Sequence, residues 1–288
     1  MMNSKSATLF FRSLPLLFAM VLSLSSQLKS QERIVISSKN LKCDDTVLVF
    51  SPAKANKKLN KSKDLKATYS TPTLFLLHGW SGCYKDWSAH YDLQEISNRT
   101  GFRIICPDGF YNSWYLNNID TTKMQWRTFF DKELYPMMKE RYAFDPHRTF
   151  ITGLSMGGHG AINIFIDDTS RFRTAGSMSG VLDLPSTSLR KSQMSKVIGD
   201  EERLCNSSSA CVRVLNIKGL TVPMIISCGY NDIYSANSEK FSQICRKNMI
   251  PHLLLLSPGK HSWQYWGFAL EQHIKLFSAI LNGENLGY

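Results

Sequence analysis

The stretch GLSMGGHGA, at residues 153–161, places one serine, Ser155, among four glycines. Glycine loses more conformational freedom on folding than any other residue, so this density indicates a backbone that needs an unusual angle or a close approach. The stretch follows the apolar run TFITG and continues into GGHGAINIF, which is compatible with a helix. Ser155 is therefore predicted to stand at a sharp strand-to-helix turn, where Gly153 and Gly157 remove side chains that would clash.

Short apolar runs bounded by turn residues recur along the chain, at 73–78, 103–106, 149–153, 174–178, 224–228 and 252–256. Runs of this length fit strands that are buried on both faces of a parallel sheet. Segments with helical spacing lie at 132–141, 239–247 and 265–281. This alternation predicts an α/β fold, with a mostly parallel central sheet and helices on both faces. Residues 183–220 break the alternation and are interpreted as an insertion over the sheet edge, so one domain is expected at 32–283.

The amino-terminal segment has the organisation of a secretory signal peptide. Lys5 and Arg12 precede an apolar run at 14–24, and the small residues Ser25 and Ser26 follow it. A membrane anchor is the alternative, but a bilayer span takes about 20 apolar residues and this run is shorter. Residues 1–26 are therefore predicted to be cleaved, leaving a secreted or periplasmic protein that is not inserted in a membrane.

The charge distribution and the cysteine spacing argue against nucleic-acid binding and against a zinc site. The net charge is +11, and much of the excess lies at 53–67, a run without the interleaved aromatic residues of a nucleic-acid site. The seven cysteines include no C-x-x-C pair, which argues against a zinc site. In an exported protein, Cys205 and Cys211 are the best-placed pair for a disulfide bridge. We expect no metal, no cofactor and no nucleic-acid partner; the oligomeric state is left open.

A G-x-S-x-G turn between a strand and a helix is the nucleophile elbow of α/β-hydrolases. In that fold an acid and then a histidine follow the serine in chain order, each at a strand end. Asp232 follows the run MIISCGYN, and His261 follows HLLLLSPGK. We therefore predict Ser155 as the nucleophile, Asp232 as the orienting acid and His261 as the base. Asp183 also falls between serine and histidine, but it opens the irregular insertion.

The early strand that ends at His78 precedes the sequence Gly79-Trp80. This position suits an oxyanion donor, so the backbone N–H groups of Trp80 and Met156 are predicted to stabilise the oxyanion. His78 is interpreted as a structural residue of that loop. Trp114 and Trp263 are candidate substrate-binding residues, because aromatic faces suit sugar rings or aromatic acyl groups.

The chain resembles the esterase D family of α/β-hydrolases, which includes S-formylglutathione hydrolases, feruloyl and carbohydrate esterases and the antigen 85 mycolyltransferases. The matching stretches run through nearly the whole mature chain: LLHGWSG (76–82), PDGFYNSWY (107–115), ITGLSMGGHGA (151–161), CGYNDIYSAN (228–237) and GKHSWQYW (259–266). The resemblance implies the same triad and oxyanion donors. One departure is Arg127, in MQWRTF, where relatives often carry an acidic residue.

These features predict an exported serine ester hydrolase that works through an acyl-enzyme on a small-molecule or oligosaccharide ester, with carbohydrate-linked acetyl or feruloyl-type esters as the expected substrates. Three alternatives remain open: an acyltransferase to a sugar, a thioesterase of the S-formylglutathione hydrolase type, and a non-catalytic carbohydrate-binding scaffold.

Overall fold

The computed structural model describes residues 31–53, 70–186, 194–199 and 202–287. The signal peptide predicted at 1–26 and most of the basic run at 53–67 lie outside the described residues.

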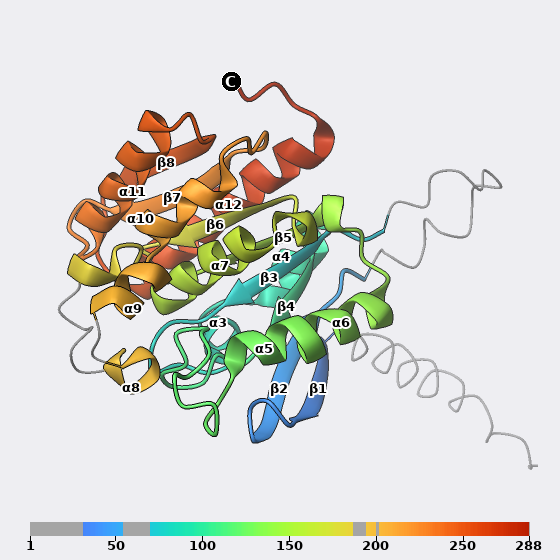
Figure 1. Cartoon of the computed structure of the whole chain (residues 1–288). Coiled ribbons are helices and arrows are strands. Elements are labelled where there is room, and N and C mark those ends of the chain that lie inside the picture. Colours follow the sequence, from blue (N-terminus) through green and yellow to red (C-terminus); the bar gives the residue numbers. More distant parts are fainter. Residues whose placement is uncertain (1–30, 54–69, 187–193, 200–201, 288) are drawn as a thin grey trace, which may run out of the picture.

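The described residues form one eight-stranded sheet in the order β1-β2-β4-β3-β5-β6-β7-β8 (Figure 1). The strands are β1 (Gln31–Ser38), β2 (Cys43–Phe50), β3 (Thr73–Leu77), β4 (Arg103–Cys106), β5 (Thr149–Gly153), β6 (Thr174–Met178), β7 (Met224–Gly229) and β8 (His252–Ser257). The pairs β1–β2 and β2–β4 are antiparallel, and every later pair is parallel. The mostly parallel sheet predicted from the sequence is confirmed, and all six expected runs are strands within one residue at each end.

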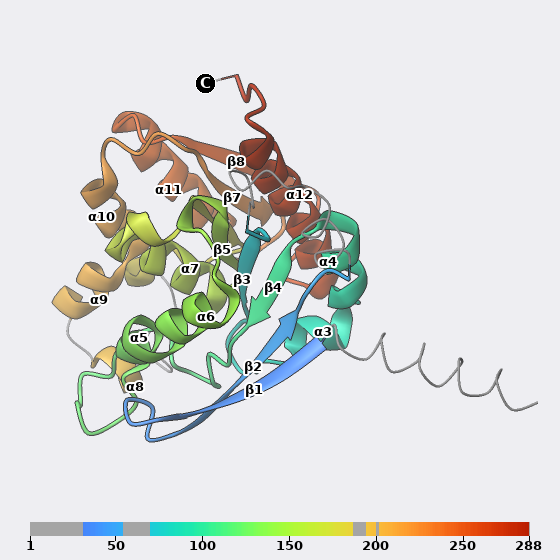
Figure 2. The same cartoon turned by 90° about the vertical axis from the view of Figure 1, so that its right-hand side faces the viewer.

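Helices cover both faces of this sheet (Figure 2). One face carries α3 (Asp86–His90), α4 (Leu93–Thr100) and α12 (Trp263–Asn282). The other face carries α5 (Trp126–Phe129) with its continuation to α6 (Tyr135–Tyr142), α7 (Met156–Asp167), α10 (Ala210–Arg213) and α11 (Ser235–Lys247). The described part of the 183–220 segment also contains α8 (Ser195–Ile198) and α9 (Glu202–Ser208). Several short helices therefore occupy the segment interpreted as an insertion.

Two apolar cores form because successive strand residues point to opposite faces of the sheet. Phe75 of β3 and Ile151 of β5 belong to the core under α7, whereas Leu74 and Phe150, one residue earlier in each strand, belong to the core under α12. Burial on both faces explains why these strands read as continuous apolar runs rather than as alternating ones.

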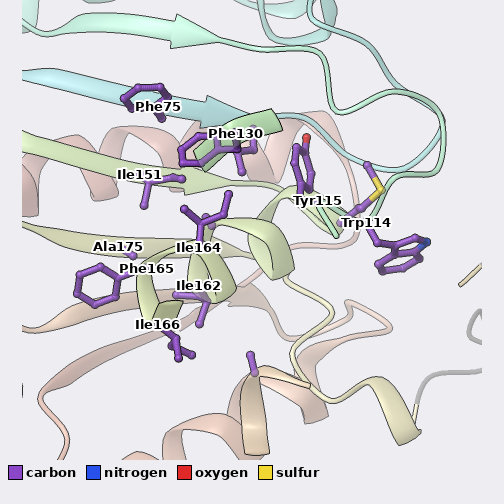
Figure 3. Packing of buried hydrophobic residues seen from close by; sticks show 14 of the residues in the cluster. Phe75, Trp114, Tyr115, Phe130, Ile151, Ile162, Ile164, Phe165, Ile166 and Ala175 are labelled. Carbon is purple, nitrogen blue, oxygen red and sulfur yellow. The ribbon is translucent and has the colours of Figure 1, made fainter. Parts of the chain in front are cut away.

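Helix α7 is the element that holds the turn at Ser155 in place. It is buried on every side from Met156 to Ile166, which explains its largely apolar sequence. In Figure 3 its residues Ile164 and Phe165 lie on the side of the helix toward the strand residues Ile151 and Ala175, and all four belong to the same core. A helix packed this completely cannot shift without disturbing the core, so the residue at its amino end is fixed relative to the sheet.

The disulfide expected between Cys205 and Cys211 is wrong for this structure. Cys211 carries a free thiol. Both cysteines are buried in the apolar core on the α7 side, where each packs as a small hydrophobic residue. Burial raises the pKa of the Cys211 thiol, which further reduces its reactivity.

Within the described residues, no helix is both long enough and apolar enough to span a bilayer.

Candidate active site

Ser155 occupies a strained backbone conformation, with φ 51° and ψ −114°. Such angles are sparsely populated by residues other than glycine, and they persist only where the surrounding structure enforces them. Two contacts enforce them here: the Ser155 N–H donates to the carbonyl of Met178 at 2.9 Å, and Gly157 packs against the end of β3. A Cβ on Gly157 would lie 2.5 Å from the carbonyl oxygen of His78, so only glycine allows this approach.

The structure brings Ser155, His261 and Asp232 together in one hydrogen-bonded chain. Nε2 of His261 lies 3.0 Å from Oγ of Ser155, and Nδ1 lies 3.0 and 3.1 Å from the two carboxylate oxygens of Asp232. Ser155 and Asp232 are buried, whereas the His261 side chain is 24% exposed. This is the geometry in which an imidazole takes a hydroxyl proton while a carboxylate holds the opposite nitrogen.

The two loops that carry Asp232 and His261 meet because β7 and β8 are parallel neighbours. Asn231 N–H donates to the carbonyl of Gly259 at 3.0 Å and ties the loops together. Burial raises the pKa of Asp232, but hydrogen bonds from His261 and from the Tyr234 N–H outweigh it, and the pKa falls below its ordinary value. The group is therefore held as a carboxylate.

Asp183, the competing acid, lies elsewhere. It is buried and pairs with Lys240, whose Nζ is 2.5 Å from Oδ2 of Asp183. The acid that contacts His261 is therefore Asp232, the one predicted from chain order.

The loop after β3 packs directly on the serine. A Cβ on Gly79 would lie 2.6 Å from the Leu154 side chain and 3.7 Å from Cβ of Ser155. The next residue is Trp80, and Met156 begins α7. Within the described part of the chain, the N–H groups of Trp80 and Met156 have no hydrogen-bond acceptor. Both are therefore available to a negatively charged oxygen beside Ser155.

His78 holds this loop from inside the protein. Nε2 accepts a hydrogen bond from the Gly109 N–H at 2.7 Å, and Nδ1 contacts the Gly79 carbonyl at 2.7 Å. Because Nε2 accepts, the proton is on Nδ1 and the ring is neutral. The His78 carbonyl also accepts from the Tyr115 hydroxyl at 2.8 Å. His78 is thus a structural residue, as its position in the sequence indicated.

A cavity of about 330 Å³ opens beside Ser155 and His261. Its walls are mainly aromatic and apolar, and they include Trp80, Leu154, Ile233, Tyr234, Trp263 and Trp266. Trp263 therefore lies at the cavity, and its role in substrate binding stays a prediction. Its ring also stacks on His90, with the ring centroids 3.9 Å apart.

Trp114, the other candidate, does not line this cavity. It is 1% exposed, and its Nε1 donates to Oδ1 of Asn112. The loop turns it inward because Phe110, Trp114 and Tyr115 all adopt positive φ values, which a sequence reading does not reveal. The expectation that Trp114 contacts substrate in this cavity is corrected accordingly.

Other features of the molecule lie outside the site. A larger recess, of about 510 Å³, lies at the amino ends of β5, β6 and β7, opposite the proposed site. Its lining does not include Ser155, Asp232 or His261. His159 and His273 are fully buried, and burial lowers the pKa of each to about 3. No cluster of His, Cys, Asp or Glu within the described ranges could hold a metal ion.

Arg127, the departure from the family pattern, is buried and pairs with Asp167 of α7. Its guanidinium also donates to the Tyr115 carbonyl at 3.1 Å. Burial lowers the pKa of Arg127 to about 9. The residue links α5 to α7 behind the site and does not enter the cavity.

Comparison with solved structures shows the same fold. A ferulic acid esterase superposes with a TM-score of 0.72 and 21% identity, over 87% of this chain and 97% of that structure. The fold and the family match together define a serine carboxylic ester hydrolase of the α/β-hydrolase superfamily. The model of the esterase family, described as a putative esterase, matches residues 38–277, and the chain belongs to that family. The resemblance stated from the sequence is thereby confirmed.

Two relatives differ in their reported substrates. An acetyl esterase from Caldicellulosiruptor saccharolyticus is 27% identical over 246 residues, which cover 80% of this chain and 91% of the relative. An S-formylglutathione hydrolase from Arabidopsis thaliana is 22% identical over 261 residues, which cover 82% and 88% of the two chains.

Proposed function

We propose that this protein is an exported esterase that hydrolyses acetyl or feruloyl-type esters linked to carbohydrate, with Ser155, His261 and Asp232 as its catalytic triad. The observation that supports the proposed triad is the unbroken chain of hydrogen bonds from Oγ of Ser155 through His261 to the Asp232 carboxylate. Ser155 and His261 line the aromatic-walled cavity. Export rests on the amino-terminal sequence alone.

In the first half-reaction, Oγ of Ser155 attacks the ester carbonyl carbon while its proton passes to Nε2 of His261. The carbonyl oxygen becomes an oxyanion and accepts hydrogen bonds from the N–H groups of Trp80 and Met156. Collapse breaks the bond to the alcohol, which leaves with the proton from His261. Asp232 keeps the imidazole in the tautomer that accepts at Nε2 and stabilises the imidazolium.

In the second half-reaction, water attacks the acyl-enzyme and gives a proton to His261. The carbonyl oxygen again carries the negative charge in the tetrahedral intermediate. Its collapse releases the acid and returns the proton from His261 to Ser155. The steps balance without any metal or redox partner.

The choice of substrate is supported by the acetyl esterase relative and by the tryptophan walls of the cavity, since aromatic faces pack well on sugar rings and on phenolic rings. A thioesterase acting on S-formylglutathione is the second candidate, favoured by the relatives of that name. Purified protein assayed on acetylated oligosaccharides, feruloylated oligosaccharides and S-formylglutathione separates the two by their kcat/KM values.

The test of the triad is Ser155→Ala. We expect the variant to lose at least about 10³-fold in kcat on a short-chain nitrophenyl ester, because the nucleophile is gone. A fluorophosphonate probe should label the wild type and leave the variant unlabelled, while thermal melting shows that both are folded. Labelling of another serine in Ser155→Ala would refute the assignment.

A further inference from the structure

The catalytic cavity contains one carboxylate that the proposed triad does not use. Asp86, the first residue of α3, lines the cavity together with Trp80 and Trp263. Apart from the imidazole of His261, it is the only ionisable side chain among Asp, Glu, Lys, Arg and His in the described lining. The rest of the wall is mainly aromatic, apolar or glycine. An ester bound at Ser155 is therefore exposed to the negative charge of this group.

No cation neutralises the Asp86 carboxylate within the described residues. It forms no salt bridge there, and its side chain accepts one weak hydrogen bond, from Sγ of Cys83 at 3.5 Å. The neighbouring Lys85 places its Nζ 5.4 Å from the centroid of the Tyr84 ring. The ring of His78 is neutral because Gly109 donates to its Nε2.

The carboxylate is also held in position beside the loop between β3 and α3 (residues 78–85), which carries the Trp80 N–H and is called the oxyanion loop here. A Cβ on Gly82 would lie 2.0 Å from Oδ2 of Asp86 and 2.8 Å from Nδ1 of His78, so the carboxylate packs against the backbone of that loop. The Asp86 N–H donates to the carbonyl of Cys83 at 3.0 Å. The charge thus has a fixed place in the cavity wall, and low-dielectric aromatic walls screen it less than water does.

We infer that Asp86 is a specificity-determining residue that selects ester substrates by charge. The cavity accepts esters whose alcohol or thiol part is neutral or cationic and discriminates against those with a carboxylate near the scissile bond. This inference rests on the proposed function and narrows it. A sugar-linked acetyl ester is neutral, whereas glutathione is an anion at neutral pH, so the charge of Asp86 favours the first substrate class.

The experiment compares two esters that differ in one carboxylate, an acetylated methyl glucoside and the matching acetylated methyl glucuronide. In the wild type at low ionic strength, kcat/KM should favour the neutral ester by about tenfold or more, the scale expected for two like charges close together. Asp86→Asn is isosteric and should lower this preference about tenfold, mainly by a gain on the glucuronide. The matched control is Asp92→Asn, which removes an exposed carboxylate that caps α4 and does not line the cavity. It should leave the preference within about twofold.

A second readout uses the wild type alone. Raising the salt concentration should reduce its preference for the neutral ester, because mobile ions screen the charge of Asp86. A wild type that shows no preference, or a preference that survives in Asp86→Asn, overturns the inference. If Asp86→Asn is inactive on both esters, the salt series decides: a preference that salt does not change refutes the charge mechanism. Failure of the proposed function is distinct, because then turnover of the neutral ester is absent or persists in Ser155→Ala.

Discussion

Asp232 is the residue whose role depends most on its surroundings. An aspartate in a loop is most often a solvated or capping residue, and the sequence offers Asp183 in the same interval. In the structure one carboxylate contacts His261 and the other pairs with Lys240. The difference arises from which strand ends are neighbours, because β7 lies directly beside β8 whereas β6 does not.

The residue-scale prediction compares the two acids. Asp232→Asn should reduce kcat at least about 10²-fold, because the amide N–H₂ favours the imidazole tautomer that cannot accept the serine proton. Asp183→Asn should cost less than about 10-fold, since it changes a pair with Lys240 that lies away from His261. Steady-state kinetics on a nitrophenyl ester checks both variants. If Asp183→Asn lost more activity than Asp232→Asn, Asp183 would be assigned as the acid of the triad.

At the scale of elements, the site depends on how closely α7 approaches β3. The other glycines of the turn allow close contacts with different neighbours. A Cβ on Gly153 would lie 2.6 Å from the Gly157 carbonyl group, and a Cβ on Gly160 would lie 2.4 Å from the Tyr115 ring. The density of glycine around Ser155 is thus explained by packing as well as by the strained angle at the serine itself.

Gly157→Ala tests this packing. The added methyl would meet the carbonyl oxygens of Leu77 and His78 within 2.6 Å, so α7 must move away from β3. We expect a loss of about 1–3 kcal/mol in the free energy of unfolding and at least about 10²-fold in kcat/KM, because Ser155 and the Met156 N–H move with the helix.

Gly101→Ala is the control for this loss of stability. Gly101 ends α4 at φ 78°. Among the described residues, no atom beyond Gly101 and its chain neighbours lies within 4 Å of the position that an added methyl group would take, so alanine costs about 1 kcal/mol through backbone strain alone. Its kcat/KM should stay close to that of the wild type. If Gly157→Ala loses stability but keeps its activity, the helix position does not control the site.

For the whole molecule, an ionisable group is buried where the antiparallel edge joins the parallel sheet. Asp45 of β2 is fully buried, and its Oδ1 accepts from the Asp108 N–H at 3.2 Å. Burial raises the pKa of Asp45 to about 8, and the nearby Asp108 carboxylate adds to the effect. The folded protein therefore keeps a proton that the unfolded chain releases near the ordinary value of 3.8.

This difference predicts how stability depends on pH. Because the folded state binds more protons between about pH 4 and pH 8, the stability from Asp45 falls as the pH rises through that window. Asp45→Asn cannot ionise, so its melting temperature relative to the wild type should rise by about 3 °C or more from pH 4.5 to pH 8.5. Thermal melts across that range measure it. Asp44→Asn, at an exposed neighbouring position, should show no such trend; an equal trend there would remove Asp45 as the cause.

The sequence alone determined the class of fold and the three residues proposed as the triad. Burial on both faces requires each parallel strand to be a continuous apolar run, and the turn at Ser155 requires glycines at fixed positions around the serine. Both patterns are local, so they can be recognised in the sequence. The amino-terminal segment led to the expectation of export, which stays a prediction because residues 1–26 lie outside the described residues.

Only the tertiary structure decided which residues from distant segments share one cavity. Trp114 and Trp263 look equivalent in the sequence, yet positive φ values in one loop bury the first, while α12 presents the second at the cavity. Cys205 and Cys211 are close in sequence but pack as core residues. The buried Asp45 and the Asp86 carboxylate in the cavity wall likewise have no local signature. Their environments are built by β4, α3 and the oxyanion loop, which come together only when the sheet forms.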